Sequence, residues 1–205
     1  MIDSYVPRLG WLLAGALLLA GCTTSPPSQV DDVCEIFSEQ RGWYRDAKRA
    51  EQRWGIPIGV LMAFSFQESS YQARARPPRG RLLWVIPWRR PSTAYGYAQA
   101  LDSTWAEYQR ATGRTRARRT NFRDAMDFIG WYNRRSADQL GLPRNDAYSL
   151  YLAYHEGPGG FRRGTYRNKT WLQNTASRVH SRANTYQNQV AGCERRLSRP
   201  WWRPF

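Results

Sequence analysis

The sequence predicts an all-α fold, mainly helical with room for one minor hairpin, in a single domain. Apolar residues recur mostly at helical spacing, and no segment shows the strict alternation that a dominant sheet requires. No internal repeat is evident. The 205 residues, less a short leader, are enough for one domain with a real core.

Two helices are expected in the first third of the chain. The first covers residues 35–54, and Gly55-Ile56-Pro57 ends it because glycine followed by proline disfavours a helix. The second covers residues 58–70 and is mostly apolar. The next region, residues 74–92, is rich in arginine, proline and tryptophan and is where a hairpin is expected.

Four more helices are expected, two of which are bounded by residues that suit a cap and a stop. They cover residues 104–112 (between Ser103 and Gly113), residues 121–139, a segment from Asn145 or Asp146 to Glu156, and residues 170–191. The basic connector 114–119 precedes the second of these helices, and Gly157-Pro158-Gly159-Gly160 ends the third.

Residues 1–21 have the features of a secretory signal peptide. Arg8 precedes an uncharged run, residues 9–20, which is shorter than the about 20 residues of a membrane-spanning helix. The run ends in small residues before Cys22 and resembles a bacterial lipobox, whose cysteine sulfur carries diacylglycerol. The alternative is an ordinary signal peptide with an incidental cysteine. Thr23 is not the aspartate typical of inner-membrane retention, so we expect a lipid anchor on the periplasmic face of the outer membrane.

The rest of the chain divides into three parts. Residues 22–33 are polar and contain proline, which predicts a lipidated tether; residues 34–194 form the folded domain, and residues 195–205 a basic, aromatic tail. Cys34 and Cys193 lie at the two ends of the domain, and in an oxidising periplasm we expect them to form a disulfide. The alternative is two unrelated buried thiols.

The net charge of +15 suits a polyanionic partner such as nucleic acid, anionic lipid or an acidic wall polymer. Export disfavours nucleic acid, whereas peptidoglycan carries lactyl and peptide carboxylates. His155 and His180, the two histidines, are too few for a convincing metal site, so neither a metal nor another cofactor is expected. No Ser/His/Asp order stands out that would indicate nucleophilic catalysis.

Glu68 is the carboxylate placed most unusually in the sequence. Helical spacing puts it on one face with Leu61, Phe64 and Ser65, an apolar face that is expected to point inward. It also lies in the last turn, at the negative end of the helix dipole. Burial and dipole both raise the pKa of a carboxyl, as a general acid near neutral pH requires. The alternative from spacing alone is an ion pair with Arg74 or Arg76.

Three motifs in order carry a family resemblance. They are Trp54-Gly55-Ile56-Pro57 with Leu61-Met62-Ala63 and Gln67-Glu68-Ser69-Ser70-Tyr71, then Gly96-Tyr97-Ala98-Gln99, then Ala153-Tyr154-His155-Glu156-Gly157-Pro158-Gly159. Together they resemble the soluble lytic transglycosylases, a lysozyme-like family that shares its fold with goose-type lysozyme. The resemblance covers roughly residues 54–160 and implies a lysozyme-like single domain.

The resemblance implies roles for four residues. Glu68 matches the single catalytic acid/base, and Ser69 shapes the site beside it. Gln99 matches a residue that lines the glycan groove, and Tyr154 a tyrosine whose hydroxyl lies close to the catalytic carboxyl. Helical spacing offers core packing as the alternative for Tyr154, together with Tyr148 and Tyr151.

His155-Glu156 stands where the family commonly has Asn-Ala, so this sequence departs from the third motif. Glu156 is interpreted either as an additional carboxylate of the site or as a partner of a local arginine such as Arg162. The insertion 74–92 also has several interpretations. It is a lip that stacks sugars on Trp84 or Trp88, a membrane contact, or a hairpin packed on the domain.

The function implied by the resemblance is cleavage of the MurNAc-GlcNAc β-1,4 bond of peptidoglycan with formation of 1,6-anhydroMurNAc. Two alternatives remain: a hydrolytic goose-type lysozyme, and a non-catalytic peptidoglycan-binding envelope lipoprotein. The expected partners are peptidoglycan strands, the membrane through Cys22, and a possible cell-envelope complex, with the protein itself a monomer.

Overall fold

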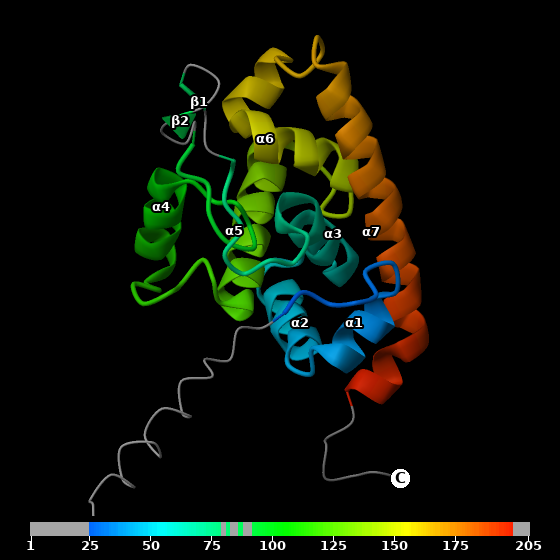
Figure 1. Ribbon diagram of the computed structural model, residues 1–205. Coiled ribbons are helices and arrows are strands. Elements are labelled where there is room, and N and C mark those ends of the chain that lie inside the picture. Colours follow the sequence, from blue (N-terminus) through cyan, green and yellow to red (C-terminus); the bar gives the residue numbers. More distant parts are fainter. Residues whose placement is uncertain (1–24, 79–80, 83–85, 88–91, 199–205) are drawn as a thin grey trace, which may run out of the picture.

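Figure 1 shows a computed structural model of the chain, which describes residues 25–78, 81–82, 86–87 and 92–198. In chain order the elements are α1 (Val33–Glu39), α2 (Trp43–Trp54), α3 (Ile58–Ser69), β1 (Arg81–Leu82), β2 (Ile86–Pro87), α4 (Asp102–Thr112), α5 (Phe122–Leu140), α6 (Ala147–Arg163) and α7 (Thr170–Leu197). The predicted all-α class with a minor hairpin is confirmed. The predicted signal peptide, Cys22, Trp84 and Trp88 lie outside the described residues.

Helix α3 forms the centre of the molecule, and nine of its twelve residues are buried. It packs against α2, α5 and the long helix α7, which runs along one side of the bundle in Figure 1. The crossing of α3 and α7 is close, because a Cβ built on Gly59 lies 2.4 Å from the Ala183 carbonyl oxygen. Only glycine fits there without a shift of the backbone.

The predicted helix 35–54 is wrong in one respect, because the chain forms two helices there. Helix α1 ends at Glu39, where Gln40 leaves the helical conformation, and α2 begins after Gly42. Glycine has a low helix propensity, which makes an interruption inexpensive. The new direction lets the Trp43 ring stack on Phe122 of α5, with ring centroids 3.7 Å apart.

Helix α4 begins at Asp102 rather than at residue 104, so the predicted cap Ser103 lies inside its first turn. The Thr93 hydroxyl oxygen accepts the hydrogen bond of the Asp102 backbone N–H instead. The caps of the next two helices are side chains: Asn121 accepts from the Asp124 N–H, and Asp146 accepts from the Ser149 N–H.

Helices α6 and α7 both extend beyond their predicted ends. Gly157 adopts φ 72° and ψ 158° and kinks α6, as the glycine-rich stop predicts, but the helix resumes and ends at Arg163. Pro158 fits the first turn of the resumed part, where proline is tolerated. Helix α7 continues to Leu197, so Cys193 and the start of the predicted tail are helical.

A buried carboxylate on α5 joins three helices and the basic connector. Asp127 is 5 % exposed and accepts hydrogen bonds from Tyr108 Oη (2.7 Å), Trp54 Nε1 (3.1 Å) and Arg53 Nη1 (3.2 Å). Arg114 pairs with the same carboxylate at 3.4 Å. The arginines and hydrogen bonds offset the cost of burying this charge, so part of the basic composition is structural.

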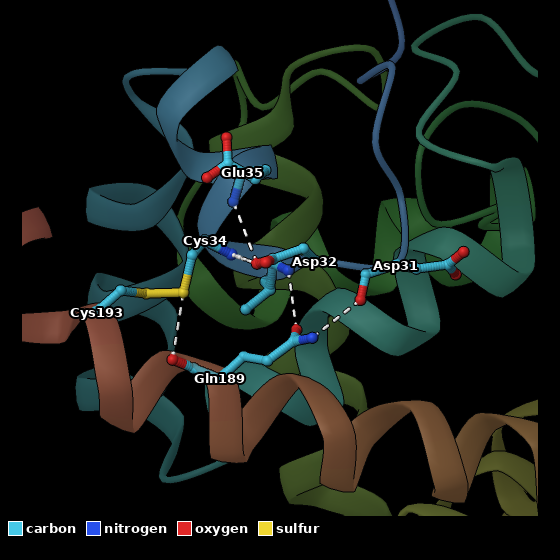
Figure 2. The surroundings of a disulfide bond; sticks show 7 residues. Asp31, Asp32, Cys34, Glu35, Gln189 and Cys193 are labelled. Atoms are coloured by element: carbon cyan, nitrogen blue, oxygen red, sulfur yellow. Dashed lines mark hydrogen bonds between the residues drawn. A yellow bond between two sulfur atoms is a disulfide. The ribbon is translucent and has the colours of Figure 1, made fainter.

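Figure 2 shows the disulfide that links the two ends of the domain. Cys34 of α1 and Cys193 of α7 are bonded, with their Cα atoms 6.2 Å apart. Nearby, the Gln189 side chain accepts from the Val33 N–H and donates to the Asp31 carbonyl, each at 3.0 Å. The start of α1 is therefore held on α7 by covalent and hydrogen bonds.

The described part of the predicted tether is attached to the fold rather than free. Val30 presents its carbonyl to the Tyr186 hydroxyl and to Arg182 Nη1, and Asp31 pairs with Arg182 at 2.9 Å. Ser28 donates its backbone N–H to Glu39 at 2.9 Å. These contacts bind residues 28–31 to α7 and α1.

The hairpin falls where the sequence predicts it. Strands β1 and β2 are antiparallel, with Arg81 paired to Pro87 and Leu82 to Ile86.

No helix in the described segments is long and apolar enough to cross a membrane.

Candidate active site

The end of α3 is fixed by an unusual reversal of the chain. Ser70 and Tyr71 both have left-handed backbone conformations, with φ of 48° and 60°, which non-glycine residues adopt only at a cost. Tyr71 is fully buried, donates from its hydroxyl to the Met62 carbonyl at 3.2 Å, and packs against Trp43. This anchor determines where the last turn of α3, with Glu68, meets α6.

Glu68 has the electrostatic properties predicted for it. Burial raises the pKa of its carboxyl from 4.5 to about 7, and a hydrogen bond from the Tyr151 hydroxyl opposes that rise in part. Burial is the larger of the two effects. No arginine of the described segments contributes to the shift, and Arg76 lies instead over the Tyr95 ring at 4.1 Å. The carboxyl is therefore poised between its two protonation states near neutral pH.

Two tyrosines of α6 lie next to Glu68. Tyr151 interacts with the carboxyl directly, and burial together with the Glu68 charge raises the pKa of its hydroxyl. Tyr154 feels the same charge, and its pKa is also raised, mainly by burial. Its hydroxyl, however, donates to the Ala98 carbonyl at 2.7 Å, and its ring packs edge-on against Phe64.

The family resemblance therefore predicts Tyr154 beside the carboxyl but does not predict Tyr151 there. The two residues are three positions apart on one helix, so a helix that brings Tyr154 near Glu68 also brings Tyr151 near it. That signal was present in the sequence and was interpreted only as core packing.

Ser69 and Gln99 both stabilise the loop that faces α3. The Ser69 hydroxyl lies 3.0 Å from the Tyr97 carbonyl oxygen and 2.9 Å from that of Ser65, and the residue is buried. Gln99 Nε2 donates to the Ala75 and Gly96 carbonyls, each at 2.9 Å. Ser69 therefore supports the shape of the site through hydrogen bonds to backbone carbonyls. The side-chain amide nitrogen of Gln99 is likewise hydrogen-bonded to backbone carbonyls.

Gly96 explains why the second motif begins with glycine. Its φ is 78°, and a Cβ built there lies 2.2 Å from the Arg119 carbonyl oxygen. The Tyr97 N–H donates to that same oxygen at 3.3 Å. The loop that carries Tyr97, Ala98 and Gln99 is thus pinned between the connector and the end of α3.

Comparison with known protein families identifies the family of this chain. The family model described as Transglycosylase SLT domain matches residues 10–193. The chain belongs to the SLT transglycosylase family. This family consists in general of lytic transglycosylases that act on peptidoglycan, and its lysozyme-like fold agrees with the helical architecture described above. No curated protein matches the chain.

His155-Glu156, where this SLT domain departs from the common third motif, forms a network of hydrogen bonds and ion pairs. The Glu156 side chain is 6 % exposed and pairs with Lys169 Nζ at 2.7 Å, with His155 Nδ1 at 2.9 Å, and with the Thr165 hydroxyl. These hydrogen bonds, that of Lys169 foremost, lower the pKa of Glu156 to about 2. It remains ionised at neutral pH, which makes it unsuitable as a general acid.

The predicted partner of Glu156 was wrong. Arg162 donates from Nη2 to the Gln139 carbonyl at 3.1 Å, and Lys169, just before α7, takes its place. The reason is the kink at Gly157, after which the chain turns back through Thr165 to Lys169 and returns a cation to Glu156. Across the described residues of the domain, no three His, Cys, Asp or Glu side chains gather as metal ligands do.

Proposed function

We propose that this SLT domain cleaves the β-1,4 bond between MurNAc and GlcNAc in peptidoglycan, with Glu68 as its single acid and base. The observation that carries the proposal is the raised pKa of Glu68, about 7, in contact with Tyr151. A carboxyl with that pKa is substantially protonated at neutral pH and also accepts a proton back readily.

The first step is protonation of the bond to be broken. Glu68 donates its proton to the glycosidic oxygen that leaves MurNAc C1, and the C1–O bond breaks through an oxocarbenium-like state. The Glu68 carboxylate formed in this step gains the hydrogen bond that Tyr151 donates, which favours the charged form. Proton transfer and carboxylate stabilisation are thus coupled at one pair of residues.

The second step needs no second carboxylate. The C6 hydroxyl of the same MurNAc attacks C1 and closes the 1,6-anhydro ring, while the Glu68 carboxylate takes the hydroxyl proton. Proximity favours this intramolecular nucleophile over water. Among the described residues, burial raises the pKa of Glu68 to about 7, whereas the hydrogen bonds of Glu156 lower its pKa to about 2.

Digestion of purified sacculi tests the proposal. The parent chain is expected to release muropeptides lighter by one water than reducing-end products, and Glu68→Gln is expected to release none while keeping its helical circular dichroism. Undiminished release by Glu68→Gln would refute the role of Glu68. Reducing-end products from the parent would establish the hydrolytic goose-type alternative, and binding without products the non-catalytic one.

We also propose that Cys22 carries a lipid that attaches the enzyme to the periplasmic face of the outer membrane. The support is the small-residue sequence that ends in Gly21-Cys22 after an apolar run too short to span a bilayer. Metabolic labelling with a fatty acid is expected to mark the parent chain and not Cys22→Ser. Cys34→Ser, which leaves Cys22 intact, is the matched control and should remain labelled.

A further inference from the structure

Trp171, at the start of α7, is much more exposed to solvent than is usual for a large apolar side chain. It is 57 % exposed, and among the described residues it and Leu101, at 43 %, are the exposed large apolar side chains. A single exposed apolar residue is ordinary on a protein surface. Trp171 differs because a chain of interactions fixes its ring.

The first of these interactions is the ion pair between the Glu156 carboxylate and Lys169. Glu156 accepts from Lys169 Nζ at 2.7 Å and holds the His155 ring through Nδ1 at 2.9 Å. The His155 ring in turn contacts Trp171 edge to face, with ring centroids 5.1 Å apart at 76°. Lys169 lies two residues before Trp171, so both sides of the contact are held by the same carboxylate.

The platform, defined as His155 and Trp171, is continuous with the candidate active site along α6. His155 follows Tyr151 by four residues, so both lie on one helix face about 6 Å apart along the axis. Tyr151 contacts Glu68. The His155–Trp171 contact therefore lies about one helical turn beyond Tyr151 on this face.

Helix α7 also connects Trp171 with the surroundings of Tyr151. From Trp171 the face continues through Thr175 to Arg178, whose Nη2 donates to the Thr175 hydroxyl at 2.9 Å. The Arg178 charge acts on the Tyr151 hydroxyl, so this arginine is near the same tyrosine that contacts Glu68. Two helices therefore lead from Trp171 to the candidate active site.

We propose that the platform binds a sugar ring of the glycan strand, at a neighbouring position from the bond that is cleaved. The flat indole face suits the C–H face of a pyranose, and an aromatic ring fixed before binding loses little entropy. A neutral His155 ring that donates from Nδ1 to Glu156 leaves Nε2 as an acceptor for a sugar hydroxyl. His155-Glu156, the departure from the common motif, thus builds a subsite. This inference rests on the proposed function.

Binding of peptide-free glycan strands tests it, in full-length chains that carry Glu68→Gln so that the strand is not cut. Trp171→Ala is expected to weaken binding about three- to tenfold, from the worth of one aromatic contact. Trp171→Phe is expected to retain most of the affinity, and Leu101→Ala, the other exposed apolar side chain, to be unaffected. Trp171 is exposed, so unchanged melting temperatures are expected in all three variants.

Several outcomes would overturn the platform. Parent-like affinity in Trp171→Ala, with cleavage by the otherwise native enzyme intact, would refute the subsite and leave the proposed function standing. Loss of binding to anionic vesicles with glycan affinity unchanged would make Trp171 a membrane contact instead. Failure of the native chain both to cleave sacculi and to bind strands would refute the proposed function and this inference together.

Discussion

The Tyr151 hydroxyl donates a hydrogen bond to the Glu68 carboxyl across the interface of α6 and α3. The two residues are 83 positions apart in the sequence, and the turn at Ser70-Tyr71 and the crossing of α3 with its neighbours bring them together. Burial raises the pKa of Glu68, and this hydrogen bond limits the rise. The balance between the two is open to direct measurement.

Tyr151→Phe should move the pH profile of cleavage to higher pH. The Tyr151 hydroxyl favours the charged carboxylate, so its removal raises the pKa of Glu68 further above about 7. Since the acid form starts the reaction, the alkaline limb of kcat/KM then shifts upward. Tyr154→Phe, which loses a bond to the Ala98 carbonyl instead, is the matched control and should leave the limb in place. A downward shift in Tyr151→Phe would contradict the assignment.

Glu68→Gln should stabilise the fold in alkaline solution. The folded pKa of about 7 exceeds the ordinary 4.5, so the folded state holds its proton more tightly than the unfolded chain. That contribution is complete below pH 4.5 and is lost as the pH rises to 7, a change on the order of 3 kcal/mol. Urea unfolding at pH 5 and pH 8 measures it. Equal differences between parent and variant at the two pH values would count against a raised pKa.

Removal of the Cys34–Cys193 disulfide should lower the free energy of unfolding by about 2–5 kcal/mol. The bond closes a loop with a sequence separation of 159 residues, so its loss frees much of the unfolded chain. The comparison uses Cys34→Ser/Cys193→Ser against the parent, both with Cys22→Ser so that no third thiol interferes. An unchanged urea midpoint would show that the hydrogen bonds of Gln189 suffice to hold α1 on α7.

Gly59→Ala should destabilise the fold by about 1–3 kcal/mol, because its Cβ would lie 2.4 Å from the Ala183 carbonyl oxygen. Gly192→Ala on the same partner helix is the control. Nothing lies within 4 Å of a Cβ at that position, so alanine there should gain about 0.5–1 kcal/mol from helix propensity. Equal urea midpoints for the two variants would refute the close crossing of α3 and α7.

The sequence allowed a good prediction of α3 and of Glu68, because both depend on local features. A mostly apolar helix bounded by Pro57 and a turn needs no knowledge of its neighbours, and a glutamate in its last turn is expected to have a raised pKa. The same holds for the cap at Asp146, whose side chain bonds within the first turn of its own helix.

The features that escaped prediction depend on contacts between distant segments. The break between α1 and α2 is fixed by Trp43 against Phe122, and the start of α4 by Thr93. The partner of Glu156 depends on the path of the chain after the Gly157 kink, which spacing does not reveal. Helical spacing predicts that Tyr151 lies in one row with Tyr148 and Tyr154, but it does not predict that α3 lies beside that row.

The attachment of residues 28–31 to α7 limits how far the domain could extend from a lipid on Cys22. Only three peptide units separate Cys22 from Ser25, the first described residue, and they span at most about 11 Å when fully extended. With the lipid that we propose on Cys22, the domain has no long spacer and must stay against the bilayer surface. Such an enzyme would trim the strands nearest the outer membrane and leave deeper layers of the wall to others. Extra residues placed between Cys22 and Ser25 would widen that zone.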